Sequence, residues 1–163
     1  MQKVQEVVVK GIYNSATKSV KKPICGFSIM CRLLLVMKHF AVYHNPERMG
    51  YLADEVSELC IVTNKSVVNL IGNRIWLFQG EGKPRKYILR GTFTADFTRA
   101  DTDDGFRHVV SGQHGTLFKP HIPVGTLAWF ERFKKSQGNF AFGLQRISDQ
   151  VIVDELKRIS GIV

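Results

Sequence analysis

Alternating apolar and polar positions predict three strands in the middle of the chain. Residues 39–44 alternate until an Asn-Pro pair ends the run, and residues 74–79 form a second apolar run. The glycine- and proline-rich residues 80–84 predict a hairpin loop that leads into a third run over residues 86–97. Gly91 interrupts this long run, so we expect a bulge or sharp bend there that curls the sheet.

Helical periodicity is found on both sides of these strands. Residues 54–59 predict a short helix, and residues 63–71 predict a second one that begins at Thr63 or Asn64 and ends at Gly72. A closing helix is predicted after Ser148 or Asp149. Its apolar face comprises Ile152, Leu156 and Ile159.

The remaining segments carry weaker patterns. Residues 98–118 are polar and rich in glycine, which indicates a long connection with one short strand at 108–110. Residues 139–147 alternate and predict a further strand. Residues 1–36 show no sustained period, so two interpretations stay open: a tail that precedes a natural start at Met37, or a real extension with a strand at 4–9. We therefore expect one α+β domain over residues 37–163.

Net charge changes this picture little. The chain carries +9, but residues 1–36 contribute +5 of it, which leaves +4 for residues 37–163. A strongly basic domain would indicate a nucleic-acid partner. Because the predicted domain is only mildly basic, its charge alone does not establish such a partner.

Cysteine usage and hydropathy bear on the compartment. The three cysteines, Cys25, Cys31 and Cys60, are odd in number and lack the spacing of metal ligands, so a reducing cytoplasm fits best. The apolar run over residues 23–36 is shorter than the roughly 20 residues that span a bilayer, and Arg32 interrupts it. We expect no membrane partner.

Two segments resemble a known family. Residues 71–77, Ile-Gly-Asn-Arg-Ile-Trp-Leu, and residues 139–147, Asn-Phe-Ala-Phe-Gly-Leu-Gln-Arg-Ile, lie within an order of elements that is similar to the PUA-like superfamily, in its EVE and YTH-like branch. The resemblance covers about residues 39–158. Asn73 replaces an Asp that is common in the family, and residues 43–47 replace its usual Trp and Ser-Glu-Pro pattern.

The resemblance implies a small curled β-barrel with short flanking helices and a pocket for a flipped base. Related domains in modification-dependent restriction systems admit a methylated or hydroxymethylated base beside a nuclease or motor. We therefore expect a non-enzymatic nucleic-acid reader without a cofactor, with DNA favoured over RNA and a nuclease or motor subunit as a further partner. Two alternatives stay open: an ordinary RNA-binding PUA-like module, and a small metal-dependent nuclease that uses His108 and His114.

Such a reader needs flat rings for stacking, polar groups for the base edge and cations for phosphates. Trp76 also fits a core role, because Ile75 and Leu77 flank it, and the basic residues also fit solvated surface charge. The base-binding candidates are Trp129, Trp76, Tyr43, His44, Phe130, Gln137 and Asn139. The phosphate-binding candidates are Lys134, Lys135, Arg132 and Arg85.

Metal and nucleotide motifs are not convincing. Three histidines, His108, His114 and His121, lie near the acidic residues 101, 103 and 104, but no spacing matches a metal site or a nuclease motif. The glycine-rich residues 80–84 lack the Gly-Lys-Ser/Thr of a phosphate loop and lie between strands. We therefore predict no metal site.

Overall fold

The computed structural model describes residues 36–50, 59–100 and 105–162. The proposals for residues 1–35 and most of the predicted helix over 54–59 lie outside these ranges, and the domain boundary at Met37 stays a prediction. The elements are β1 (His39–His44), α1 (Pro46–Met49), β2 (Cys60–Thr63), β3 (Arg74–Glu81), β4 (Lys86–Thr94), β5 (Phe97–Ala100), β6 (His108–Ser111), β7 (Gly115–Pro123), α2 (Phe130–Ser136), η1 (Gly138–Phe140), β8 (Gln145–Ile147) and α3 (Gln150–Ser160).

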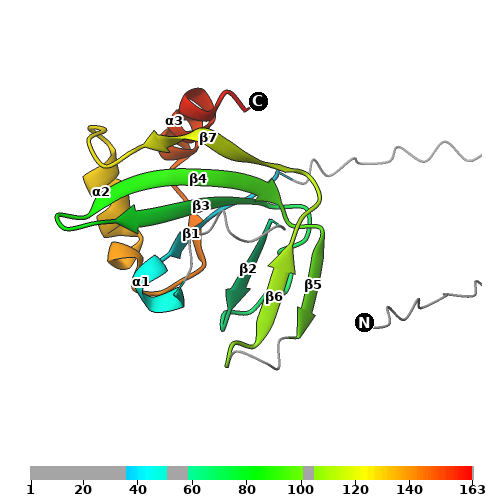
Figure 1. Ribbon diagram of the computed structural model, residues 1–163. Helices are drawn as coiled ribbons and strands as arrows, with labels where there is room; N and C mark the ends of the chain where they lie inside the picture. Colours follow the sequence, from blue (N-terminus) through cyan, green and yellow to red (C-terminus); the bar gives the residue numbers. More distant parts are fainter. Residues whose placement is uncertain (1–35, 51–58, 101–104, 163) are drawn as a thin grey trace, which may run out of the picture. The chain divides into compact units, whose positions relative to one another are not determined.

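The strands form two sheets, as Figure 1 shows. The larger sheet has the order β7-β4-β3-β1-β8, with β1 parallel to β3 and its other pairs antiparallel. The smaller sheet has the order β2-β6-β5. The predicted α+β class and the predicted strands β1, β3 and β4 are therefore confirmed. No closed barrel is found among the described strands, so the expected curled barrel is not confirmed.

The predicted irregularity near Gly91 is present. Arg90 is skipped when β4 pairs with β3, since Leu89 lies opposite Phe78 and Gly91 opposite Leu77. The pairing of β4 with β7 shifts at the same place. A Cβ atom at Gly91 would meet the Thr116 carbonyl at 2.5 Å, so glycine allows β7 to approach β4 closely.

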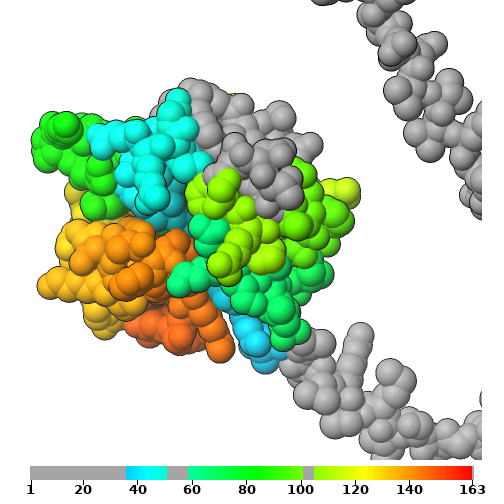
Figure 2. Space-filling view, turned by 90° about the horizontal axis from the view of Figure 1, so that it is seen from below, coloured from blue at the N-terminus to red at the C-terminus, as the bar shows by residue number. Residues whose placement is uncertain are grey.

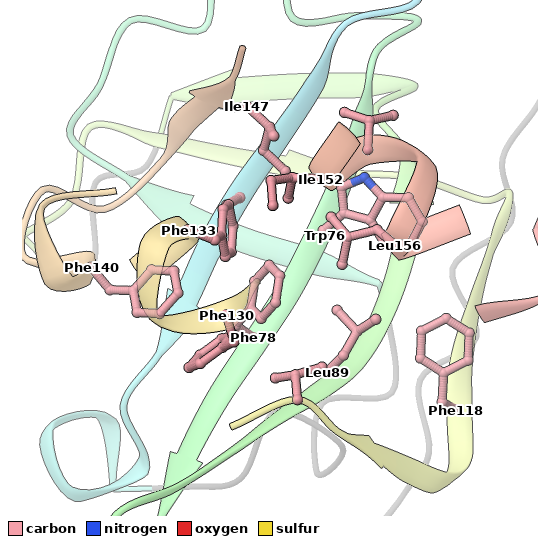
Figure 3. Close-up of a cluster of buried hydrophobic side chains, with 13 residues drawn as sticks. Trp76, Phe78, Leu89, Phe118, Phe130, Phe133, Phe140, Ile147, Ile152 and Leu156 are labelled. Atoms are coloured by element: carbon pink, nitrogen blue, oxygen red, sulfur yellow. The ribbon is translucent and has the colours of Figure 1, made fainter. Parts of the chain in front are cut away.

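Side chains along β3 alternate between two apolar cores. In the first core, Trp76 and Phe78 pack with residues of α2 and α3, as Figure 3 shows for Phe130, Phe133 and other ring and aliphatic side chains. In the second core, Ile75 and Leu77 pack with residues of β2, β4 and β6. Successive side chains of a strand point to opposite faces, so β3 is buried on both faces.

One predicted element is wrong, and another is confirmed only over its last three residues. Residues 63–71 form no helix: β2 ends at Thr63, whose Oγ1 accepts a hydrogen bond from the Lys65 backbone N–H at 3.0 Å. Thr63 thus forms a local turn instead of capping a helix. Residues 139–147 are a strand only over Gln145–Ile147. Gly138, Asn139 and Phe140 have φ of 57°, 52° and 63°, which a strand cannot contain.

The predicted long connection over residues 98–118 is also corrected. The short strand at 108–110 is confirmed as part of β6, but the same segment includes most of β5 and the start of β7. These strands escaped prediction because β5 has few buried side chains and glycines interrupt the run before β7. The closing helix is confirmed as α3, with the Asp149 side chain accepting from the Val151 N–H at 3.0 Å.

His39 of β1 is linked to Trp76 of β3 by a hydrogen bond and a ring contact. Its Nδ1 accepts a hydrogen bond from Trp76 Nε1 at 3.0 Å, and the two rings stack with centroids 6.1 Å apart. Burial lowers the pKa of His39, and the charges of Arg74 and Lys157 lower it further, against the opposing charge of Asp154. The bond to Trp76 requires a neutral imidazole, since a protonated Nδ1 cannot accept.

We expect the domain to lose stability on mild acidification. The unfolded chain binds a proton at His39 near pH 6.5, whereas the folded chain binds it only at lower pH, so the free energy of unfolding falls as the pH drops below about 6.5. Urea unfolding at a series of pH values measures this slope. His39→Gln should flatten it, whereas the exposed Asn64→Ala, which changes no titratable group, should leave it unchanged. An equal slope in the His39 variant would contradict the assignment.

Asn73 anchors the turn before β3. Its Oδ1 accepts from the Lys38 backbone N–H at 2.7 Å, and its Nδ2 donates to the Asn69 carbonyl at 2.8 Å. The second bond needs an amide donor, which an aspartate at this position could not supply. Asn69 has a φ of 61°, so the bond also holds a left-handed residue in place.

Removing this amide should destabilise the domain. Asn73→Ala leaves two partly buried backbone groups unpaired, which we expect to cost about 1–3 kcal/mol of unfolding free energy. Asn73→Asp keeps the acceptor but loses the donor, so it should also lower the free energy of unfolding. Urea denaturation checks both, with the exposed Asn64→Ala as control. A cost for Asn73→Ala no larger than that of the control would show that the two bonds do not hold the turn.

Candidate functional site

A cavity of about 520 Å³ opens between the end of β1, β2 and the segment that follows α2. Figure 2 views the face on which the cyan β1–α1 segment, the orange segment after α2 and the lime segment of β6 meet. The apolar lining of this cavity includes Val42, Ile61, Leu77 and Leu144, which belong to the second core. This volume lies within the range of small-ligand pockets, about 300–1,000 Å³.

Aromatic rings form part of the lining. Tyr43 stacks on Phe140 with centroids 5.1 Å apart and planes 8° from parallel. Phe142 also lines the cavity, yet 59% of it is exposed, which is unusual for such a large apolar side chain. A Cβ at Gly138 would collide with the Phe142 ring, so the ring lies directly against the backbone of Gly138. The left-handed turn therefore positions an exposed ring at the cavity.

The polar lining is basic. Arg48, Lys65 and Arg85 line the cavity, and none of its described lining residues carries a carboxylate. Arg85 pairs with Glu47 at 3.0 Å on the exposed side. An exposed pair of this kind contributes little to stability, so Arg85 can exchange Glu47 for another anion at small cost. The cavity thus favours a ligand that carries negative charge.

Local sequence explains how α1 supports this wall. Asn45 is the N-cap, with its Oδ1 accepting from the Glu47 N–H at 3.2 Å, and Pro46 occupies the first turn, where no N–H is needed. Gly50 ends the helix with a φ of 80°. This short helix places Arg48 in the lining of the cavity.

Tyr43 and Arg85 meet over β3. A Cβ at Gly80 would collide with the Tyr43 hydroxyl and would lie 2.8 Å from Arg85 Cδ, so both side chains cross the strand where it has none. Burial raises the pKa of the Tyr43 hydroxyl, and the positive charge of Arg85 offsets part of the rise. The hydroxyl is therefore protonated at neutral pH and can donate a hydrogen bond.

The structure brings together four of the predicted site residues. Tyr43, His44, Asn139 and Arg85 all line this cavity. Asn139 is exposed and takes a left-handed conformation, which asparagine tolerates better than most residues. A ring, an imidazole, an amide and a guanidinium thus meet at one place.

Three predicted base-stacking residues lie elsewhere. Trp76 and Phe130 are 0% exposed and belong to the first core, so neither offers a ring face to a ligand. Trp129 is half-buried, packs edge-on against Phe130 and Phe133, and does not line the cavity. The core interpretation therefore holds for Trp76. The burial of Phe130 and the packing of Trp129 could not be predicted, because apolar periodicity does not distinguish a core ring from a pocket ring.

The predicted phosphate-binding residues of α2 are also outside this cavity. Lys134 lies over the Tyr87 ring at 5.1 Å and pairs with Glu131 at 2.8 Å. Lys135 is exposed on the same helix. Arg132 and Gln137 line a second cavity of about 370 Å³, together with residues of β8 and the start of α3. The candidates on α2 therefore do not share a cavity with the candidates on β1.

Sequence reasoning missed several lining residues. Phe142 was hidden because residues 139–147 resemble a strand, in which it would alternate with Phe140 as an ordinary sheet residue. Arg48 and Lys65 lie in short polar segments whose charge is typical of any surface. Only the left-handed signals of Asn139 and the glycines around Phe142 could have indicated an exposed loop ring.

Arg90 is buried although it lies beside the hairpin, with 2% of it exposed. Its guanidinium donates to Glu81 at 2.7 Å and contacts His121, and Glu81 also accepts from Gln79 at 2.6 Å. Arg90 is thus the buried member of a partly buried polar network that includes Glu81, Gln79 and His121.

Two further features of the described residues concern metal binding and membrane insertion. Within residues 36–50, 59–100 and 105–162, no group of three or more His, Cys, Asp or Glu side chains could hold a metal ion. The acidic residues 101, 103 and 104 lie outside those ranges. Over the same part of the chain, every helix is too short or too polar to cross a bilayer.

Comparison of the chain with protein-family models and with curated proteins found no match.

The turn that positions Phe142 can be tested with two glycines. Gly138 and Gly143 both have positive φ, 57° and 69°, so alanine at either should cost about 1–2 kcal/mol of stability. Only Gly138→Ala also collides with the Phe142 ring, since nothing lies within 4 Å of a Cβ at Gly143. We expect a larger loss for Gly138→Ala and a shift of the Phe142 ring signals in NMR spectra. Equal losses without such a shift would contradict this packing.

Proposed function

We propose that this domain binds a nucleic acid and takes one unstacked, methylated or hydroxymethylated base into the cavity beside β1. The observation that carries the proposal is the exposed Phe142 ring in a cavity that Arg48, Lys65 and Arg85 line and no described carboxylate enters. Exposed rings with neighbouring cations are typical of sites that hold single-stranded nucleic acid.

The lining contains the kinds of group that base recognition needs, which are a ring, hydrogen-bonding groups and cations. Phe142 offers a flat face for stacking, and the apolar floor of Val42 and Leu144 suits a methyl group. Asn139, which is exposed, supplies a donor and an acceptor for the edge of the base. The cations would hold the attached phosphates, which position a nucleic acid without reading its sequence.

The resemblance to EVE-type PUA-like domains supports the same function, because these domains take a modified base into a pocket. It does not identify the base. The expectation of a nuclease or motor subunit as partner rests on that resemblance alone, as does the preference for DNA.

Removing the Phe142 ring should weaken binding. We expect Phe142→Ala to lower the affinity of the full chain for a single-stranded oligonucleotide about 5- to 150-fold, as loss of one base–ring stack does. Fluorescence anisotropy with labelled DNA and RNA oligonucleotides measures the change in affinity. The effect of modification is measured by comparing cytosine with 5-methylcytosine and 5-hydroxymethylcytosine, and adenine with N6-methyladenine, in otherwise identical oligonucleotides.

Phe97→Ala provides a matched control. Phe97 is 58% exposed, close to the 59% of Phe142, but it lies on β5 and does not line the cavity. Equal affinities of the Phe142 variant and the wild-type protein would overturn the proposed site. Equal affinities for modified and unmodified oligonucleotides would remove the modified base and leave an ordinary nucleic-acid-binding module.

A further inference from the structure

Two neighbours hold the side chain of Arg85 at the first cavity, the one of about 520 Å³. The side chain crosses Gly80, where a Cβ would lie 2.8 Å from Arg85 Cδ, and the Tyr43 hydroxyl lies over the same glycine. Burial raises the pKa of this hydroxyl and the charge of Arg85 offsets part of the rise, so the two groups are close neighbours. The position of Arg85 is therefore fixed by packing, without help from a carboxylate.

A carboxylate nevertheless contacts the same guanidinium. Glu47 Oε2 accepts from Arg85 Nη2 at 3.0 Å, and the Glu47 side chain is 56% exposed. Helix α1 determines where Glu47 lies, because the N-cap Asn45 accepts from the Glu47 N–H and Pro46 occupies the first turn. Arg85 lines the cavity and Glu47 does not. The carboxylate therefore reaches Arg85 from outside the cavity lining.

Glu47 and an anion of the ligand need the same guanidinium. A phosphate binds arginine best through two parallel N–H···O bonds, but Glu47 already occupies Nη2. A phosphate on the other nitrogens would lie beside a charge of its own sign, which is unfavourable. An orienting effect of Glu47 on Arg85 would favour binding, but Gly80 and Tyr43 already fix that side chain. Competition is therefore the larger of the two effects.

We propose that Glu47 is an internal competitor for the ligand's anion at Arg85, and that it lowers the affinity of the first cavity for anionic ligands. This inference rests on the proposed function, because the anion that Glu47 opposes is a phosphate of the bound strand. Loss of the Glu47 charge should thus strengthen binding, whereas loss of a cation that lines the cavity should weaken it.

The first test is Glu47→Gln, which keeps the size of the side chain and removes its charge. We expect the affinity of the full chain for a labelled single-stranded oligonucleotide to rise about two- to fivefold, since an exposed ion pair changes an equilibrium by no more than about this factor. The slope of log affinity against log salt concentration should steepen by at most about 0.7, the contribution of one contact to a single strand. Fluorescence anisotropy at several salt concentrations measures both.

A double-mutant cycle separates competition at Arg85 from a general change of charge. In the Arg85→Gln background, Glu47→Gln should leave the affinity unchanged, because no guanidinium remains for the carboxylate to occupy.

Glu131→Gln is the matched control. Glu131 is also an exposed carboxylate in the first turn of a short helix and pairs with Lys134 at 2.8 Å, but neither residue lines a cavity. We expect Glu131→Gln to leave the affinity unchanged. Circular dichroism and urea unfolding verify that each variant folds.

Inorganic phosphate is a second probe, which does not depend on a base. An NMR titration that follows the Arg85 Nε–H signal should show tighter phosphate binding by Glu47→Gln than by the wild-type protein. This result combined with no binding of any oligonucleotide would support the competition and overturn the proposed function. An unchanged or lower affinity of Glu47→Gln for an oligonucleotide that the wild-type protein binds would overturn the competition and leave the proposed function intact. An equal gain in the Arg85→Gln background would also overturn the competition.

Discussion

The alternation of side chains along β3 is the constraint on which the rest of the domain depends. Trp76 and Phe78 complete the core beneath α2 and α3, while Ile75 and Leu77 complete the core against the smaller sheet. A shift of register by one residue would exchange these sets and destroy both cores. β1 pairs with β3 in parallel over its whole length, so its alternation follows. Val42 joins the second core, whereas Tyr43 packs at the edge of the first and reaches the cavity.

The left-handed turn after α2 connects this packing to the lining of the two cavities. Phe140 is 8% exposed and stacks on Tyr43 and Phe78, which fixes the turn to the first core. From that fixed point the chain places Gln137 at one cavity and Phe142 at the other. Backbone strain of this kind persists only where surrounding contacts determine it. The packing of Phe140 therefore accounts for a conformation that the local sequence would otherwise avoid.

Local signals explain how much of this could be predicted. The hairpin, the bulge beside Gly91 and the Asp149 cap each depend on a few neighbouring residues, so the sequence identified them. The turn at Gly138 depends on a distant contact between Phe140 and Tyr43, and it was mistaken for a strand. The site followed the same division: Tyr43 and His44 were found at the end of a correctly predicted strand, but Phe142 was not. Trp76 and Phe130 satisfied the chemistry of stacking, but only tertiary packing shows that they are buried.

Net charge conceals the electrostatic character of the two cavities. Residues 37–163 carry only +4, yet the first cavity has three cationic lining residues and no described carboxylate. Several acidic groups are engaged elsewhere, as Glu131 is with Lys134 and Glu155 with Arg158. A charge that acts on a bound phosphate must lie within about a Debye length of it, some 8 Å at physiological ionic strength. The local arrangement of Arg48, Lys65 and Arg85, with Glu47 paired to Arg85 at 3.0 Å, therefore bears on the charge of a ligand at the cavity more than the net charge of the domain does.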